Sequence, residues 1–189
     1  MDKPVNLEIP KDFYSDSDNQ PFRFCKVCEC DLSDGKTSYS IEKAFKRVDE
    51  DKDITLFEIA ICMKCAEKQS QKMSEESREY IMRIMGENGF MEKRMNLWES
   101  NWEKSWKNHC LFSQEEVQLN DEYHIVGHFI GDKLISNLSP FVMGQSFIEQ
   151  IQENLSAETK EEMDNFGQQF LGPDPTIKAL LRDCQFVMI

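Results

Sequence analysis

Long apolar runs are missing from this chain of 189 residues. No stretch approaches the roughly 18 consecutive apolar residues that a membrane-spanning helix needs. The first ten residues lack the cationic start and the apolar stretch of a signal peptide. Basic residues are also scarce, since 22 lysines and arginines stand against 35 aspartates and glutamates, a net charge of −13. Such an acidic surface repels phosphate backbones and anionic lipids, so we expect a cytoplasmic protein without a membrane partner and with little general affinity for nucleic acid.

Catalytic motifs are missing as well. The sequence has no glycine-rich phosphate loop, no nucleophile elbow and no paired histidine–carboxylate signature. Hydrophobic residues make up 40% of the chain, which is enough for a packed core. By elimination, we expect a non-enzymatic module that interacts with, or regulates, a protein partner.

Cysteine, by contrast, is abundant and clustered. Five of the seven cysteines fall in two groups, the segment 25–30 and the segment 62–65. Two CxxC pairs at this separation predict one tetrahedral zinc ion, with the ligands Cys25, Cys28, Cys62 and Cys65. Cys30 could replace Cys28, although the CxxC spacing suits a knuckle turn better. Four thiolates leave the ion no open position, so the predicted zinc is structural.

A thiol redox function is the alternative interpretation of the second pair. A strand, then Cys62-x-x-Cys65, then a helix is also the order found in thioredoxin-type dithiols. This interpretation leaves the first CxxC unexplained, and the sequence shows no βαβ pattern before the motif.

The residues around the cysteines predict the local fold. Tyr39, Ile41 and Phe45 alternate with polar residues as in a strand, residues 54–61 supply a second β-rich run, and the segment after Cys65 is typical of a helix. A knuckle, a hairpin and a CxxC at a helix start resemble treble-clef and zinc-ribbon-like zinc fingers over residues 22–72. The resemblance implies an α+β fold but no single function, because such folds serve many roles. In both halves, through segments 156–161 and 172–173, the chain also resembles an uncharacterised bacterial group with two CxxC pairs, to which no activity is attached.

The sequence also contains an internal repeat. The pattern Tyr39-x-Ile-x-x-x-Phe45 recurs as Tyr123-x-Ile-x-x-x-Phe129, 84 positions later, and Cys25 corresponds to Cys110. The segments 73–79 and 155–161 match at an offset of 82. The local alternative is that the serines of these two segments are merely helix N-caps.

If the repeat is real, the second copy is degenerate and metal-free. Three ligand positions map to Ser113, about Gly144 and about Phe147. We expect apolar packing to replace the metal there, by Phe141, Val142, Met143 and Phe147. Histidines 109, 124 and 128 do not supply the missing framework, and we expect the face that carries His124 and His128 to be solvated.

A connecting helix is predicted over residues 91–108, because Met91, Met95, Trp98, Trp102 and Trp106 recur at helical spacing. This stripe is interpreted as a core seam between the copies or, alternatively, as a partner surface formed by the three tryptophans.

Residues 22–47 offer a second functional alternative, because they carry six bases and four acids. Contact with nucleic acid would require a patch formed by Arg23, Lys26, Lys43, Lys46 and Arg47. The predicted organisation is an N-terminal arm (1–21), a zinc-binding repeat (22–90), the connecting helix (91–108), a metal-free repeat (109–172) and a tail (173–189).

Overall fold

The computed structural model describes residues 7–50, 52–87, 89–99, 106–136 and 139–171. Its centre is a six-stranded antiparallel sheet in the order β1-β5-β4-β2-β3, with β6 also paired to β4. The strands are β1 (Leu7–Glu8), β2 (Ser38–Asp49), β3 (Lys52–Cys62), β4 (Glu122–Ile130), β5 (Lys133–Leu134) and β6 (Phe141–Gly144).

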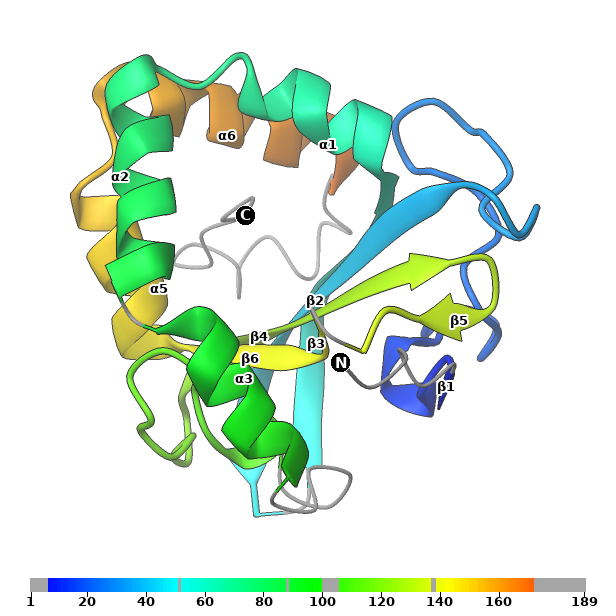
Figure 1. Cartoon of the computed structure of the whole chain (residues 1–189), viewed down its shortest axis with the longest axis horizontal. Coiled ribbons are helices and arrows are strands. Elements are labelled where there is room, and N and C mark those ends of the chain that lie inside the picture. The colour runs from blue at the N-terminus through cyan, green and yellow to red at the C-terminus, as the bar shows by residue number, and fades with distance from the viewer. Residues whose placement is uncertain (1–6, 51, 88, 100–105, 137–138, 172–189) are drawn as a thin grey trace.

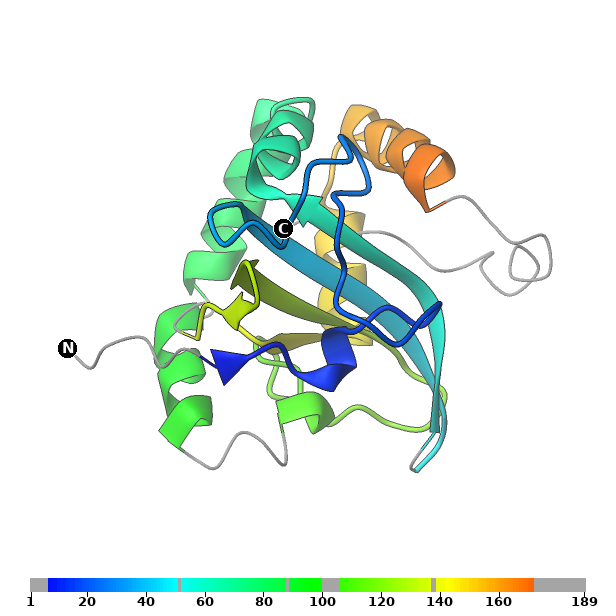
Figure 2. The ribbon, with the colours of Figure 1, turned by 90° about the vertical axis from the view of Figure 1, so that its right-hand side faces the viewer.

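The α-helices gather on one face of this sheet, and the N-terminal segment crosses the other (Figures 1 and 2). The α-helices are α1 (Met63–Ser70), α2 (Glu75–Glu87), α3 (Phe90–Glu99), α5 (Gln145–Glu153) and α6 (Ala157–Phe170), and the 3-10 helices are η1 (Lys11–Phe13) and η2 (Trp106–Asn108). The combination of an antiparallel sheet with separate helices agrees with the predicted α+β class.

Both faces of the sheet are buried. Tyr39 and Ile41 of β2 and Phe129 of β4 point into a core that also holds Phe13 of the N-terminal segment. The opposite face contributes Val126 to a second core, with residues of α2, α5 and β6. The alternation of apolar residues therefore predicts the first core, while the second depends on helices that cover the remaining face.

The two halves of the chain meet at the middle of the sheet in a symmetric register. β2 pairs with β4 so that Tyr39 lies opposite Phe129 and Phe45 lies opposite Tyr123, around a central pair of Glu42 and Val126. The members of this central pair are 84 positions apart, the offset of the sequence repeat. β3 then flanks β2, and β6 flanks β4, in matching registers.

The N-terminal ends of α2 and α6 also meet in a reciprocal arrangement. The Ser74 N–H donates to Thr159 Oγ1 at 3.0 Å, and the Ser156 N–H donates to Ser77 Oγ at 3.0 Å. The two capping hydroxyls, those of Ser74 and Ser156, lie 2.9 Å apart. The serines are therefore N-caps, and they also join the two halves.

The expectation that His124 and His128 lie on a solvated face is wrong. His124 is 2% exposed, and its Nδ1 lies 2.7 Å from Glu42 Oε1. Burial lowers the pKa of His128 to about 4, so this imidazole is uncharged at neutral pH. Strand alternation correctly put the two histidines on one face, but helices cover that face.

Only part of the predicted connecting helix, residues 91–108, lies among the described residues. α3 ends at Glu99 and η2 begins at Trp106, while residues 100–105, including Trp102, lie outside the described residues. The predicted tail, residues 173–189, lies outside them too.

Candidate metal centre

A tight knuckle presents the first cysteine group. The Cys25 N–H donates to the Cys30 carbonyl at 3.0 Å, and the Glu29 N–H donates to the Cys25 carbonyl at 2.9 Å. Glu29 closes the turn with a φ of 58°, a left-handed conformation. The Lys26 N–H donates to the Ala60 carbonyl at 2.9 Å, which ties the knuckle to β3.

The β2–β3 hairpin delivers the second group to the same place. Cys62 ends β3 and is the N-cap residue of α1, and Cys65 lies in the first turn of that helix. The Cys62 N–H donates to Cys25 Sγ at 3.3 Å, so backbone and thiol from the two groups are in contact. A strand that runs directly into a helix thus aims Cys62 and Cys65 at the knuckle.

The sulfur atoms form a cluster of the size that a metal ion requires. Those of Cys25, Cys28, Cys30 and Cys62 all lie within 4.8 Å of one another. Cys28 Sγ and Cys62 Sγ are 3.8 Å apart. With zinc–sulfur bonds of about 2.3 Å, the edge of a tetrahedral four-thiolate site is also about 3.8 Å. These four thiols could therefore hold a metal ion.

Cys65 lies next to this group of four. It follows Cys62 by three residues in the first turn of α1 and is not a member of the group. The sequence predicted Cys65 as a ligand and named Cys30 as a possible replacement for Cys28, whereas the structure places Cys30 together with Cys25, Cys28 and Cys62. The signal for Cys30 was present in the spacing Cys25-x-x-Cys28-x-Cys30, because a knuckle that returns on itself brings its last residue back beside its first.

The thiols differ in their protonation. The backbone N–H of Cys30 is the main cause that lowers the pKa of Cys28 to about 6. Burial raises the pKa of Cys30 to about 12, and it also raises the pKa values of Cys25 and Cys65. Since the thiolate is the metal-binding form, the lowered pKa favours that form at Cys28.

The equivalent place in the second half keeps the knuckle. The Cys110 N–H donates to the Glu115 carbonyl at 2.9 Å, and the Gln114 N–H donates to the Cys110 carbonyl at 3.0 Å, each 85 positions after its counterpart. Gln114 has a φ of 63°, like Glu29 in the first half. The backbone of the knuckle therefore forms without a second CxxC.

Aromatic packing lies beside the knuckle of the second half, at the positions that the sequence comparison aligns with Cys62 and Cys65. Phe147 of α5, at the place that corresponds to Cys65, stacks on Phe112 of the knuckle with ring centroids 4.1 Å apart and planes at 6°. A Cβ added at Gly144 would lie 3.1 Å from Cys110 Cβ, so little room remains for a side chain at the position of Cys62. Among the described residues, the thiols of the first half form the one cluster that could hold a metal ion.

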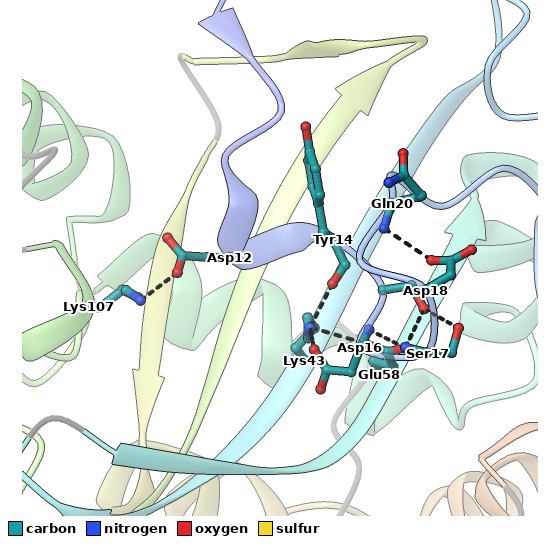
Figure 3. A network of polar contacts seen from close by, with 10 residues as sticks. Asp12, Tyr14, Asp16, Ser17, Asp18, Gln20, Lys43, Glu58 and Lys107 are labelled. Atoms are coloured by element: carbon teal, nitrogen blue, oxygen red, sulfur yellow. Dashed lines mark hydrogen bonds and ion pairs between the residues drawn. The ribbon is translucent and has the colours of Figure 1, made fainter.

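The basic residues of the first half do not form a common surface. Lys43 is 2% exposed, and its Nζ donates to the Tyr14 carbonyl at 2.7 Å and contacts Asp16 Oδ1 at 2.5 Å and Glu58 Oε2 at 3.1 Å (Figure 3). Its assignment to a nucleic-acid patch is therefore wrong, because the N-terminal segment folds over that face of β2. Lys107, which also contacts Asp12 at 2.5 Å, helps to fasten this segment (Figure 3).

The other members of that patch are dispersed. Arg47 pairs with Asp53 at 3.3 Å, and Lys46, on the opposite face of β2, lies 3.6 Å from a carboxylate oxygen of Glu122. Arg23 and Lys26 remain exposed beside the knuckle. Two free cations are a weak basis for binding a phosphate backbone.

The predicted tryptophan surface is also altered. Trp106 is 4% exposed and stacks on Phe13, with ring centroids 5.8 Å apart, so it belongs to the core and is not available to a partner. The side chain of Trp98 and the whole of Trp102 lie outside the described part of the chain. Sequence spacing alone could not show that the N-terminal segment supplies a ring to cover Trp106.

No helix within the described ranges is long and apolar enough to cross a membrane. Comparison of the chain with protein-family models, with curated proteins and with solved structures finds no match. The geometry of the thiol cluster is therefore the basis for assigning a function.

Proposed function

We propose that this protein is a non-enzymatic zinc-binding module for protein interaction or regulation. The supporting observation is the meeting of two cysteine groups, in which the sulfurs of Cys25, Cys28 and Cys30 of the knuckle and of Cys62 at the start of α1 lie within 4.8 Å of one another. A thiol-rich set of ligands favours zinc over the harder oxygen-seeking cations. The predicted ligands are Cys25, Cys28, Cys62 and Cys65.

The zinc in this proposal is structural. It joins the knuckle to the N-terminal end of α1, which makes the first half a treble-clef-like finger of knuckle, hairpin and helix. A four-thiolate shell has no position for a substrate or an activated water, so the site holds the fold and performs no reaction. The sulfur atoms of Cys28 and Cys62 lie 3.8 Å apart and belong to different cysteine groups. This favours a shared metal ion over a redox pair, which would be formed by Cys62 and Cys65 of a single group.

The second half, in this proposal, is a degenerate copy of the same unit. Support comes from the matching knuckle hydrogen bonds, the symmetric β2–β4 register and the reciprocal Ser74–Thr159 and Ser156–Ser77 hydrogen bonds. In the second half, the Phe112–Phe147 stack takes the structural place of the metal.

A protein partner is proposed because exposed apolar side chains lie on the helical side. Met82 of α2 and Met91 and Met95 of α3 are 68%, 52% and 61% exposed. Methionine adapts its shape to varied apolar surfaces, which suits a contact with a protein.

Elemental analysis of protein purified under reducing conditions tests the metal assignment. We expect one zinc per chain, and we expect Cys62→Ser to lose the metal and much of the stability of the fold, because metal binding supplies folding free energy to such a small unit. Cys110→Ser is the control, since it removes a buried thiol from the second half, at the position that corresponds to Cys25. A wild-type protein that is equally stable without metal, or that carries a Cys62–Cys65 disulfide under cellular redox conditions, would contradict the proposal.

A further inference from the structure

Five cysteines lie in or beside the thiol cluster, one more than the four that a zinc ion uses. Cys30 belongs to the group whose sulfurs all lie within 4.8 Å of one another, and Cys65 is not a member of that group. Zinc in a structural site takes four ligands. One of these two thiols must therefore stay outside the shell at any moment.

Cys30 and Cys65 approach the same three thiols from different elements. The sulfur of Cys30 lies within 4.8 Å of those of Cys25, Cys28 and Cys62, whereas Cys65 follows Cys62 by three residues in the first turn of α1. The sulfur of Cys25 accepts the backbone N–H of Cys62 at 3.3 Å. Three sulfurs thus form a common base, and two others approach it from different elements, the knuckle and α1.

The two candidate ligands also differ in their position in the fold and in their solvent exposure. Cys30 ends the knuckle and is half-buried, whereas Cys65 is 8% exposed in the first turn of α1. The sulfur of Cys30 already lies within 4.8 Å of those of Cys25, Cys28 and Cys62, and the CxxC spacing from Cys62 lets Cys65 offer its thiol to the same ion.

We propose that Cys30 and Cys65 are interchangeable fourth ligands, so that the zinc alternates between two four-thiolate shells and always leaves one thiol free beside it. The proposal rests on the zinc-binding function above. It deepens that function, because a bound ion with an adjacent spare thiol can exchange ligands without passing through a three-coordinate state.

Titration with Co²⁺, whose visible absorption reports four-thiolate tetrahedral coordination, distinguishes the two shells. The variants are Cys30→Ser, Cys65→Ser and the double variant, with Cys110→Ser as the control for the loss of a cysteine outside the cluster. We expect the wild type and both single variants to bind one Co²⁺ with a four-thiolate spectrum and with affinities within about tenfold of one another. The double variant should lose that spectrum and bind at least about a hundredfold more weakly, because one of four thiolates is gone.

Alkylation of the zinc-loaded protein by iodoacetamide, with peptide mapping, gives a second readout. In the wild type one thiol of the cluster should react. In Cys65→Ser the zinc should protect Cys30, and in Cys30→Ser it should protect Cys65. A purely structural role of either cysteine would not change the protection of the other.

Three results would overturn the inference. The first is a single variant that binds Co²⁺ as weakly as the double variant, and the second is a double variant that binds like the wild type. The third is failure of both Cys65→Ser and Cys65→Ala to fold in the presence of Zn²⁺, since Cys65 would then be indispensable. A wild type that binds neither metal would instead refute the zinc-binding function itself, before any variant is compared.

Discussion

Replacing Phe147 with alanine should selectively weaken the second half of the protein, which in our proposal holds no metal. The side chain is 2% exposed, and it stacks on Phe112 at 4.1 Å where the first half has its thiol cluster. Truncation of a buried phenylalanine costs about 3–5 kcal/mol, through lost apolar burial and the cavity left behind. This is a large share of the about 5–15 kcal/mol that stabilises a typical domain.

Urea unfolding of the zinc-loaded protein, followed by circular dichroism, measures this cost. Phe147→Leu is the matched variant, since it keeps an apolar side chain but removes the ring stack, and we expect it to cost about 0.5–1.5 kcal/mol. Met82→Ala, at a side chain that is 68% exposed, should change the free energy of unfolding by less than about 0.5 kcal/mol.

The zinc content separates the two halves in the same samples. Phe147→Ala should retain one zinc per chain below its unfolding transition, because none of the clustered thiols lies in the second half. A loss of less than about 1 kcal/mol for Phe147→Ala, well below the range for a buried phenylalanine, would refute the idea that the aromatic stack replaces the metal.

Three other expectations concern charged and titratable groups. Lys43→Met should lower the free energy of unfolding by about 1–3 kcal/mol, less than the loss of a fully buried ion pair because Asp16 is 51% exposed. Lys46→Met is the control in the same urea unfolding experiment, and equal effects of the two variants would contradict the burial of Lys43. Because His128 has a pKa of about 4 in the fold and about 6.5 when unfolded, the unfolded chain binds more protons between these values, so stability should fall as the pH drops from about 6.5 to 4, by up to about 3 kcal/mol. His128→Gln should remove that part of the pH dependence, and an unchanged slope would contradict it. In gel-shift titrations nucleic acid should bind weakly at physiological salt, and tight, sequence-dependent binding would show that the charge argument is wrong.

Local chemistry made several features of this protein predictable. The CxxC spacing indicated a knuckle because two thiols separated by two residues require a tight turn, and Cys25 to Cys30 adopt one. Alternation indicated β2, and the serine caps indicated the starts of α2 and α6, since these signals depend only on residues close in sequence.

Burial of the polar residues was not predictable in the same way. Alternation along β4 puts His124 and His128 on one face, but it does not reveal what covers that face. The sequence indicates that Lys43 is a surface cation, whereas in the fold the N-terminal segment places Asp16 beside it. The sequence indicates that Trp106 belongs to an apolar stripe of a helix, whereas in the fold Phe13 covers it.

The sequence by itself therefore determined the elements, their caps and the two cysteine groups that could hold an ion. Only the tertiary structure decided that Cys30 joins the cluster, that Phe112 meets Phe147, and that β2 of one half pairs with β4 of the other. The physical reason is the separation along the sequence of the residues that interact. Turns, alternation and capping act over a few residues, whereas the contacts of these side chains join segments about 30 to 85 positions apart, and only folding brings such segments together.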